Sequence, residues 1–318
     1  MPVAIAERTI STATFCPTCG QSEIVVCLRA PDRFHGRKDL YELVRCLSCD
    51  LVWLKDAPPP REMGAHYGTD YDRAIAAGGA DPNHWTERRD LLTSYKSGGS
   101  ILDLGCSSGG FLQSLDRDSW TRYGIEMSAE VARYAEVNAA AKVFVGDILD
   151  APFAPNSFDA ITCFHVFEHL YQPREVLNRV STWLKPGGIF FTMMPNIDSA
   201  GARIFKSYWF ALELPRHLYH FSPASLRYLA QSVGLREVSL TTNREVFIEE
   251  SVRYIVDDLR CKMGSPRAPM AKRRARSFAR RAIRKGFRIT ILPVLNALAS
   301  MAGDGESIHA VFTKMSLR

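Results

Sequence analysis

The chain lacks any apolar run that approaches the ~20 residues needed to cross a bilayer. Residues 1–14 also lack the basic-then-apolar build of a secretory signal peptide. Because 46% of its 318 residues are hydrophobic, the chain can bury a full-sized core, and no class of disordered protein fits this composition. These features predict a cytoplasmic globular protein with one large domain and one or two accessory modules.

Acidic residues are missing from one long basic segment. Residues 259–303 contain twelve Lys or Arg and no Asp or Glu, so the rest of the chain carries a net charge of −6 although the whole carries +6. A basic amphipathic helix over 272–287, followed by an apolar run over 289–302, is typical of an interfacial membrane anchor. We therefore expect peripheral contact with the inner face of a membrane through residues 271–302. RNA binding and a solvated helix packed on the main domain are the alternatives.

Disulfides are not expected, because the thiols of a cytoplasmic chain stay reduced. Four of the eight cysteines form two C-x-x-C pairs, Cys16 with Cys19 and Cys46 with Cys49, separated by 26 residues. Four thiolates make a closed tetrahedral site, so this pattern predicts a structural Zn²⁺ ion. A redox C-x-x-C is the alternative, although the second pair and the absence of a thioredoxin-like βαβ context argue against it. The remaining cysteines are expected to be buried or incidental thiols: Cys27, Cys106, Cys163 and Cys261.

From Ser100 onward, short apolar runs alternate with amphipathic stretches, a pattern typical of βαβ units and a mostly parallel sheet. We expect strands at 100–104, 121–126, 142–145, 158–164, 188–194, 236–242 and 307–315. Helices are expected between them, including one that begins at Ser222-Pro223 and ends at Gly234. Another should bury one face made by Val176, Leu177, Val180 and Trp183. The predicted fold class is therefore α/β, with an open doubly wound sheet.

Breaks in composition divide the chain into four predicted segments. A run of prolines from Pro58 to Pro60 marks the first boundary. The segments are a zinc ribbon over 1–56, a linker and connecting helix over 57–98, a main domain over 99–243 and 303–318, and a basic helical insertion over 244–302.

A glycine-rich loop, Asp103-x-Gly105-x-x-x-Gly109, follows the first strand of the main domain. Glycine takes positive φ without penalty and a helix N-terminus presents free N–H groups, so a small polar ligand belongs there. Enzymes that bind NAD(P) use a similar loop. An acid inside the loop, however, would repel a dinucleotide pyrophosphate and attract the sulfonium and amino groups of S-adenosylmethionine.

Two further acids end the next two strands. Glu126 is placed to bind both ribose hydroxyls, and Asp147 can accept a hydrogen bond from the adenine amino group. The predicted cofactor-binding residues are Asp103, Gly105, Cys106, Ser107, Gly109, Glu126, Met127, Asp147, Ile148 and Phe164.

Six motifs between residues 100 and 195 resemble the ordered motifs of class I S-adenosylmethionine methyltransferases. They are Leu-Asp-Leu-Gly-Cys, Gly-Ile-Glu-Met-Ser, Gly-Asp-Ile, Ser-Phe-Asp-Ala-Ile, Val-Phe-Glu-His-Leu and Leu-Lys-Pro-Gly-Gly. The resemblance implies a Rossmann-like seven-stranded sheet whose last strand, here 307–315, is antiparallel. Ser107 departs from the pattern, since many members have glycine there, and a serine fits if its φ stays negative.

The segment from Cys46 to Leu54 resembles the N-terminal zinc ribbon of nucleotide-sugar C-methyltransferases, which join such a ribbon to the same transferase domain. Those enzymes carry a further C-terminal domain that we do not expect in a chain of this length. Their catalytic histidines match His169 and His217. Their tyrosine and glutamate, however, correspond to Leu214 and Arg216.

Residues after the fourth and fifth strands are candidates for the acceptor side. The sequence lacks the Asn/Asp-Pro-Pro-Tyr signature of adenine or amide methylation and the Pro-Cys nucleophile of cytosine C5 methylation. A hydroxyl acceptor needs a base, and a histidine near its own pKa suits that task. The predicted catalytic residues are His217 as first choice, with His169, His220 and Tyr219.

Because Leu214 and Arg216 replace the tyrosine and glutamate, the acceptor prediction is histidine-assisted O-methylation of a sugar, glycoconjugate or other small molecule, as in ubiquinone-type O-methyltransferases. Two alternatives remain open: methylation of rRNA or tRNA bound through the zinc ribbon and the insertion, and C-methylation of a nucleotide sugar. Purely structural roles for the three histidines also remain open.

Overall fold

The computed structural model describes residues 15–67, 85–245, 247–263 and 305–315. Contacts divide the chain into two compact units. The unit that we call the sheet unit takes in residues 67–194, 227–240 and 309–318. The other, the N-terminal unit, takes in residues 1–66, 195–226 and 241–308.

The sheet unit is built on a seven-stranded sheet in the order β10-β11-β8-β7-β4-β5-β6. The strands are β4 (Gly99–Leu104), β5 (Trp120–Glu126), β6 (Lys142–Val145), β7 (Phe158–Phe164), β8 (Leu184–Pro195), β10 (Leu235–Asn243) and β11 (Ser307–Lys314). The four pairs that join β6, β5, β4, β7 and β8 are parallel, and the last strand is antiparallel. The predicted α/β fold class is confirmed.

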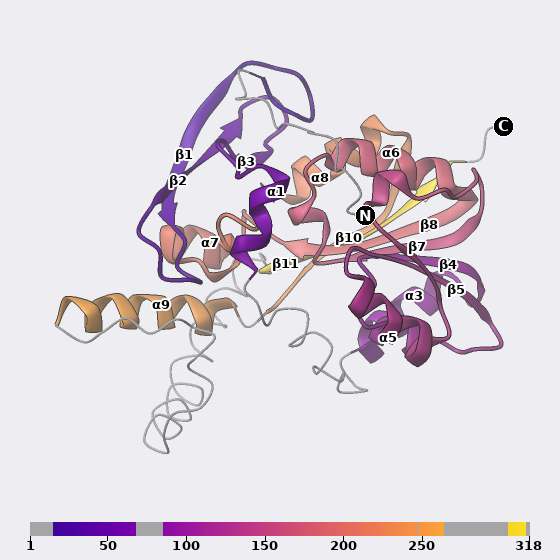
Figure 1. Ribbon diagram of the computed structural model, residues 1–318. Coiled ribbons are helices and arrows are strands. Elements are labelled where there is room, and N and C mark those ends of the chain that lie inside the picture. Colours follow the sequence, from indigo (N-terminus) through magenta and orange to yellow (C-terminus); the bar gives the residue numbers. More distant parts are fainter. Residues whose placement is uncertain (1–14, 68–84, 246, 264–304, 316–318) are drawn as a thin grey trace. The chain divides into compact units, whose positions relative to one another are not determined.

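Helices cover both faces of this sheet. They are α3 (Thr86–Tyr95), α4 (Gly110–Ser114), α5 (Ala129–Ala139), α6 (Pro173–Trp183) and α8 (Pro223–Ser232), with the short 3-10 helices η3 (Ile148–Asp150) and η4 (Phe167–His169). Figure 1 shows α6 and α8 on one face and α3 and α5 on the other. The predicted apolar face of α6 is buried as expected. The Ser222 Oγ accepts from the Ser225 N–H at 3.1 Å, which confirms the predicted start of α8.

The core of the sheet unit includes the connecting helix α3. Leu92 of α3 is fully buried in one cluster with Phe111 of α4, Phe191 of β8 and Val311 of β11. Trp85, next to the start of α3, packs edge-on against Phe111 at 6.0 Å between ring centroids. Burial of these side chains holds α3 against the sheet, which positions its polar residues near the strand ends.

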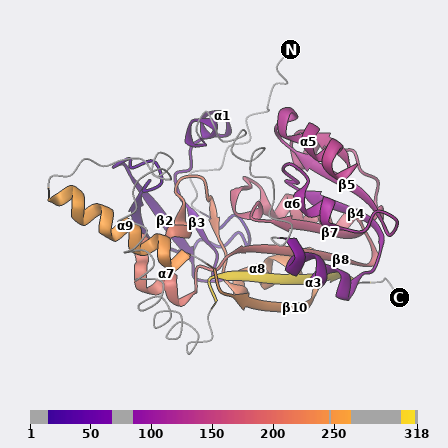
Figure 2. The same cartoon turned by 90° about the horizontal axis from the view of Figure 1, so that it is seen from below.

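The N-terminal unit contains an antiparallel sheet in the order β1-β2-β3-β9. Its strands are β1 (Ile24–Pro31), β2 (Leu40–Cys46), β3 (Val52–Leu54) and β9 (Tyr219–His220). Its helices are α1 (Pro60–Met63), η1 (Gly64–His66), α7 (Ala200–Phe205), η5 (Lys206–Tyr208), η6 (Phe210–Leu212) and α9 (Phe247–Lys262). Figures 1 and 2 both show α7 and α9 side by side. The sequence pattern does not predict β9.

The helix α9 is the described part of the predicted insertion. Residues 264–304 lie outside the described residues, and the predicted membrane contact over 271–302 lies there too. Among the residues that the structure describes, no helix combines the length and the apolar character needed to cross a membrane.

Candidate functional site

The glycine-rich loop connects β4 to α4 in the sheet unit. Three of its residues have positive φ: Gly105 at 68°, Ser107 at 52° and Gly109 at 80°. The condition under which a serine would fit here without strain, a negative φ, is therefore not met. Left-handed backbone costs a non-glycine residue roughly 1–2 kcal/mol. Here the Ser107 N–H donates to Glu126 Oε2 at 3.0 Å, and this bond helps to hold the loop in its strained form.

The three predicted acids lie at one edge of the sheet, because β4, β5 and β6 are parallel neighbours. Asp103 is only 5% exposed, and its Oδ1 accepts from the Thr162 hydroxyl at 2.7 Å. Burial raises the pKa of Asp103 to about 7. Glu126 accepts from the backbone N–H of Ser107 and of Ser128, each at 3.0 Å. The Asp147 carboxylate accepts from the Leu149 N–H at 2.8 Å and so caps η3.

The other predicted cofactor residues differ in exposure. Met127 is 64% exposed, whereas Cys106 and Ile148 are buried. Burial raises the pKa of the Cys106 thiol, so it stays protonated. Phe164 is half-buried and meets Phe111 and Phe191 edge-on, each at 4.9 Å between ring centroids. The loop thus leads into α4, whose Phe111 packs against Phe164.

Arg88 is a polar residue of this region that the sequence analysis missed. Its guanidinium lies 4.9 Å from the Trp85 ring centroid and 5.5 Å from that of Phe164. Its charge also acts to lower the pKa of Asp103, against the larger effect of burial. No local motif marks this arginine, because only the packing of α3 brings it near the strand ends.

Strand β7 leads to a second cluster that the sequence analysis did not single out. His165 has a φ of 54°, and its Nδ1 lies 3.5 Å from Oε1 of the buried Glu168. The predicted catalytic residue His169 follows at the end of η4, where its Nδ1 lies 3.3 Å from the Tyr67 hydroxyl. His169 is therefore the one predicted catalytic residue in the sheet unit.

The other three predicted catalytic residues belong to the N-terminal unit. His217 is 5% exposed, and its Nδ1 lies 2.8 Å from the Ala211 carbonyl oxygen. Because a carbonyl can only accept, Nδ1 must carry the proton, and in neutral His217 the basic nitrogen is Nε2. This Nε2 lies 3.6 Å from Glu213 Oε2. Glu213 also forms an ion pair with Arg216, whose guanidinium stacks 4.1 Å above the Phe34 ring.

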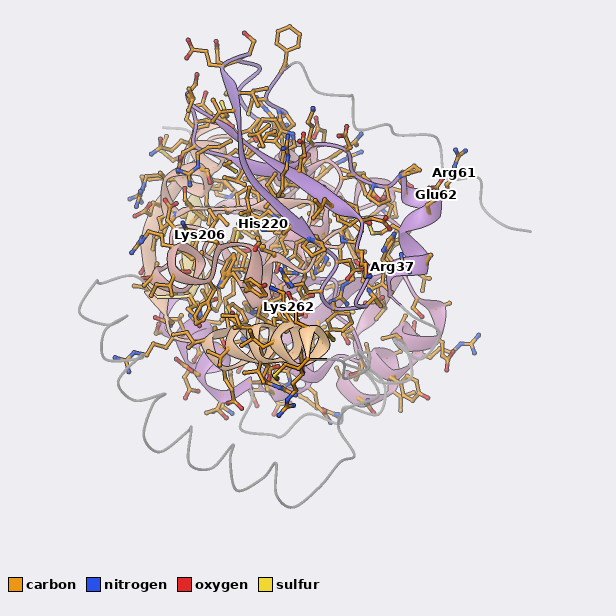
Figure 3. All side chains as sticks on the ribbon, turned by 90° about the vertical axis from the view of Figure 1, so that its left-hand side faces the viewer. Arg37, Arg61, Glu62, Lys206, His220 and Lys262 are labelled. Atoms are coloured by element: carbon orange, nitrogen blue, oxygen red, sulfur yellow. The ribbon has the colours of Figure 1, made fainter. Side chains whose placement is uncertain are left out.

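Tyr219 and His220 form β9, where they pair with Trp53 and Val52 of β3. Both side chains are 2% exposed. The His220 ring centroid lies 6.2 Å from that of His217. In Figure 3, the charged side chain of Arg61 on α1 points outward. The structure therefore brings His217, Tyr219 and His220 together.

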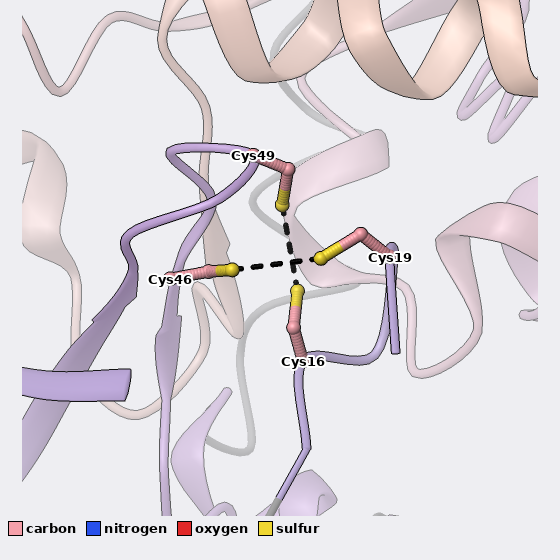
Figure 4. Close-up of side chains that lie close together, drawn as sticks. All are labelled: Cys16, Cys19, Cys46 and Cys49. Carbon is pink, nitrogen blue, oxygen red and sulfur yellow. Dashed lines mark hydrogen bonds between the residues drawn. The ribbon is translucent and has the colours of Figure 1, made fainter. Parts of the chain in front are cut away.

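The four predicted cysteine ligands converge in the N-terminal unit, as Figure 4 shows. The Sγ atoms of Cys16 and Cys49 lie 3.5 Å apart, as do those of Cys19 and Cys46. All four sulfur atoms lie within 4.8 Å of one another. Bonds of about 2.3 Å from four sulfurs to one zinc ion require sulfur separations of about 3.8 Å. The cluster therefore fits a tetrahedral metal ion.

The doubly wound seven-stranded sheet with an antiparallel last strand, and the acids at the ends of three consecutive strands, agree with the arrangement expected of a class I S-adenosylmethionine-dependent methyltransferase. Comparison of sequences gives the same result. Residues 80–240, half of the chain, match the family model described as a methyltransferase domain. The chain belongs to this family, and its methyl donor is S-adenosylmethionine.

The similar curated proteins include ubiquinone biosynthesis O-methyltransferases. The one from Ralstonia nicotianae is 28% identical in an alignment 160 residues long, and the match covers 46% of this chain and 67% of that protein. The one from Pectobacterium carotovorum is also 28% identical, over 45% of this chain and 65% of that protein. This chain therefore spans about two thirds of the length of each of these two relatives.

Solved structures show the same fold. Phosphoethanolamine N-methyltransferase 2 of Haemonchus contortus, in complex with S-adenosyl-L-methionine, matches with a TM-score of 0.53 and 18% identity. The match covers 83% of this chain and 62% of that one.

Proposed function

We propose that the protein transfers a methyl group to a hydroxyl of a small molecule, such as a sugar or glycoconjugate, with His217 as the base. One observation carries this proposal: the hydrogen bond from Nδ1 to the Ala211 carbonyl makes Nε2 the proton-accepting nitrogen. The O-methyltransferase names of the similar curated proteins support a hydroxyl acceptor.

On the donor side, the residues present fit S-adenosylmethionine. The buried Asp103 carboxylate becomes easier to ionise beside a cation, so it suits the amino and sulfonium groups. Arg88 offers the opposite charge for the carboxylate of the methionine part. Glu126 and Asp147 follow neighbouring strands at positions suited to the ribose hydroxyls and the adenine amino group. When bound, the donor supplies an electrophilic methyl group, and the protein contributes orientation.

On the acceptor side, His217 Nε2 would take the hydroxyl proton as the acceptor oxygen bonds the methyl carbon. The bond from that carbon to the donor's sulfur would break at the same time and release S-adenosylhomocysteine. Glu213, 3.6 Å from this nitrogen, stabilises the imidazolium that results. We propose that Tyr219 and His220, which lie beside His217, orient the acceptor. A catalytic role for His169, in the sheet unit, is a separate hypothesis.

The structure suggests a direct experiment on the base. Replacing His217 with alanine should lower turnover by about 10²- to 10⁴-fold, the usual contribution of a general base. The affinity for S-adenosylmethionine should stay within about twofold, because the donor residues above lie in the sheet unit. Release of S-adenosylhomocysteine would be measured against lipid-linked glycans, nucleotide sugars, quinol-like phenols and rRNA.

The matched control is His35→Ala. His35 also belongs to the N-terminal unit, and its Nδ1 bonds Asp32 at 2.9 Å. This variant should keep its turnover. Unchanged turnover in His217→Ala would remove His217 from the mechanism, and methylation of rRNA alone would reject the small-molecule acceptor.

We further propose that the four cysteines hold a structural Zn²⁺ ion. The convergence of four sulfur atoms supports this proposal, because four thiolates fill a tetrahedral shell and leave no position for water. Cys16, Cys46 and Cys49 are buried, as suits a structural site.

A further inference from the structure

The histidine segment, His217 to Ser222, is attached to the four-cysteine site through the backbone. Strand β3 begins three residues after Cys49, and it pairs with β9 inside this segment. The Leu54 N–H also donates to the Leu218 carbonyl at 2.8 Å. A strand of two residues has too few hydrogen bonds to hold a position by itself. The placement of the histidine segment therefore depends on its neighbours: β3 pairs with β9, and the Ile197 N–H donates to the Phe221 carbonyl at 2.9 Å.

A side-chain link joins the same two regions. Asp50 follows Cys49 directly, and its N–H donates to the Cys46 carbonyl at 3.0 Å, which closes the turn between these two cysteines. Its Oδ2 accepts from the buried Ser222 hydroxyl at 2.8 Å. Its Oδ1 lies 3.1 Å from the Arg45 guanidinium. Both carboxylate oxygens are thus engaged, and their direction is set by the cysteine turn.

Ser222 also lies directly before α8 and caps the first turn of that helix. Its hydroxyl accepts from the Ser225 N–H at 3.1 Å while it donates to Asp50. One hydroxyl therefore fixes the end of the histidine segment to the helix on one side and to the cysteine turn on the other.

We infer that Asp50 is a positioning residue that couples the four-cysteine site to the histidine segment. A metal ion bound by the four cysteines fixes the conformation of the turn from Cys46 to Leu51. The bonds that Asp50 and β3 make to residues 217–222 then hold those residues in place. The inference rests on the proposed metal site and on the proposed role of His217. It assigns the metal site a part in placing the acceptor-side histidines as well as in local folding.

Hydrogen exchange of the full chain tests this coupling. We expect removal of Zn²⁺ by a chelator to speed exchange in peptides covering 217–222 at least tenfold and to leave residues 101–104 of β4 unchanged. Unchanged exchange in 217–222, with faster exchange confined to 46–51, would overturn the inference. Equal acceleration in 101–104 would also overturn it, because the metal would then support the whole fold without specificity.

Variants of Asp50 test the side-chain link with Zn²⁺ in place. Asp50 has a φ of 64°, which glycine and asparagine both tolerate. Asp50→Gly should keep one zinc per chain and speed exchange in 217–222 about tenfold. Asp50→Asn should restore most of the protection, because its amide oxygen can still accept from Ser222. Failure of this rescue would leave Asp50 with a merely local role.

The matched control is Asp198→Ala, which removes the other carboxylate partner of Arg45, at 2.9 Å, and leaves the bond from Asp50 to Ser222. Exchange in 217–222 should not change in this variant, and an effect equal to that of Asp50→Gly would overturn the inference. Metal analysis of the same samples and turnover of His217→Ala report on the two proposed functions separately. A failure of either is therefore distinguishable from a failure of the coupling.

Discussion

Asp103 carries a carboxylate that is costly to ionise where it lies. Its ordinary pKa is near 4, and burial raises it to about 7 in the folded protein. The folded state therefore binds more protons than the unfolded state between these pH values. The contribution of Asp103 to the free energy of unfolding is fully present below about pH 4. It is lost as the pH rises from about 4 to about 7, at up to ~1.4 kcal/mol per pH unit. In the proposed donor site, this cost would be offset by the positive charge of S-adenosylmethionine.

Replacing Asp103 with asparagine should remove this pH dependence. The free energy of unfolding of the variant, minus that of the wild type, should rise between pH 4 and pH 7 and level off above. Urea unfolding across this pH range measures the difference. At pH 8 the variant should bind S-adenosylmethionine about 10- to 100-fold more weakly by calorimetry, because a charge-assisted contact of about 1.5–3 kcal/mol is lost.

The exposed Asp118 provides the control for this variant. Asp118→Asn should alter neither the pH profile nor the binding. If the difference in free energy of unfolding between Asp103→Asn and the wild type does not change with pH, Asp103 ionises normally. If the variant binds S-adenosylmethionine as tightly as the wild type, Asp103 does not belong to the donor site.

At the scale of single residues, the sequence predicted position better than conformation. Asp103, Glu126 and Asp147 could be placed at one edge of the sheet, because each lies near the end of a short apolar run that forms a parallel strand. Ser107 could not be assigned correctly, since its positive φ depends on a hydrogen bond to Glu126 on the next strand.

At the scale of elements, the packing of α4 against α5 explains why the second glycine of the loop, Gly109, cannot be replaced by a larger residue without cost. A Cβ on Gly109 would lie 2.8 Å from Ala135 Cα, and the φ of Gly109 is 80°. The glycine therefore serves close helix packing as well as backbone conformation.

Gly109→Ala and Gly187→Ala separate these two effects. Gly187 also has a positive φ, of 72°, but nothing lies within 4 Å of its missing Cβ. The free energy of unfolding of both variants should fall by about 1–2 kcal/mol, because alanine is strained in the left-handed backbone conformation. Gly109→Ala should lose about 1–3 kcal/mol more, because the extra methyl overpacks the contact with α5. Urea unfolding compares the two, and equal losses would show that the helices move apart freely.

The seven strands of the main sheet were all predictable as elements, because each is a short apolar run bounded by turn residues. The expected bounds differ mainly at β8, which begins at Leu184, four residues before the predicted start. Strand β9 has no such signal. Its two residues become a strand only because β3, far earlier in the chain, offers a free edge.

At the scale of the whole molecule, a bound metal ion would be expected to contribute to folding. The purified chain should contain one zinc per molecule by elemental analysis, and chelation should lower its melting temperature by several degrees. Cys46→Ser should lose the metal. Cys27→Ser should retain it, because Cys27 is exposed on β1 and does not belong to the four-cysteine cluster.

A chain with less than about 0.1 zinc after refolding with Zn²⁺, or a Cys46→Ser variant that keeps its metal, would refute the zinc site. Retention of iron in place of zinc would change the assigned metal and leave the four ligands as they are.

The amino-acid sequence alone determined the methyl donor, the α/β fold class and the two cysteine pairs, because each is written in residues close together along the chain. Only the tertiary structure decided which nitrogen of His217 is basic, where Arg88 lies and how the cysteine turn meets Ser222. Those features arise from contacts between residues that are distant in sequence. Packing and hydrogen bonds across the fold determine such contacts, and local sequence patterns do not predict them.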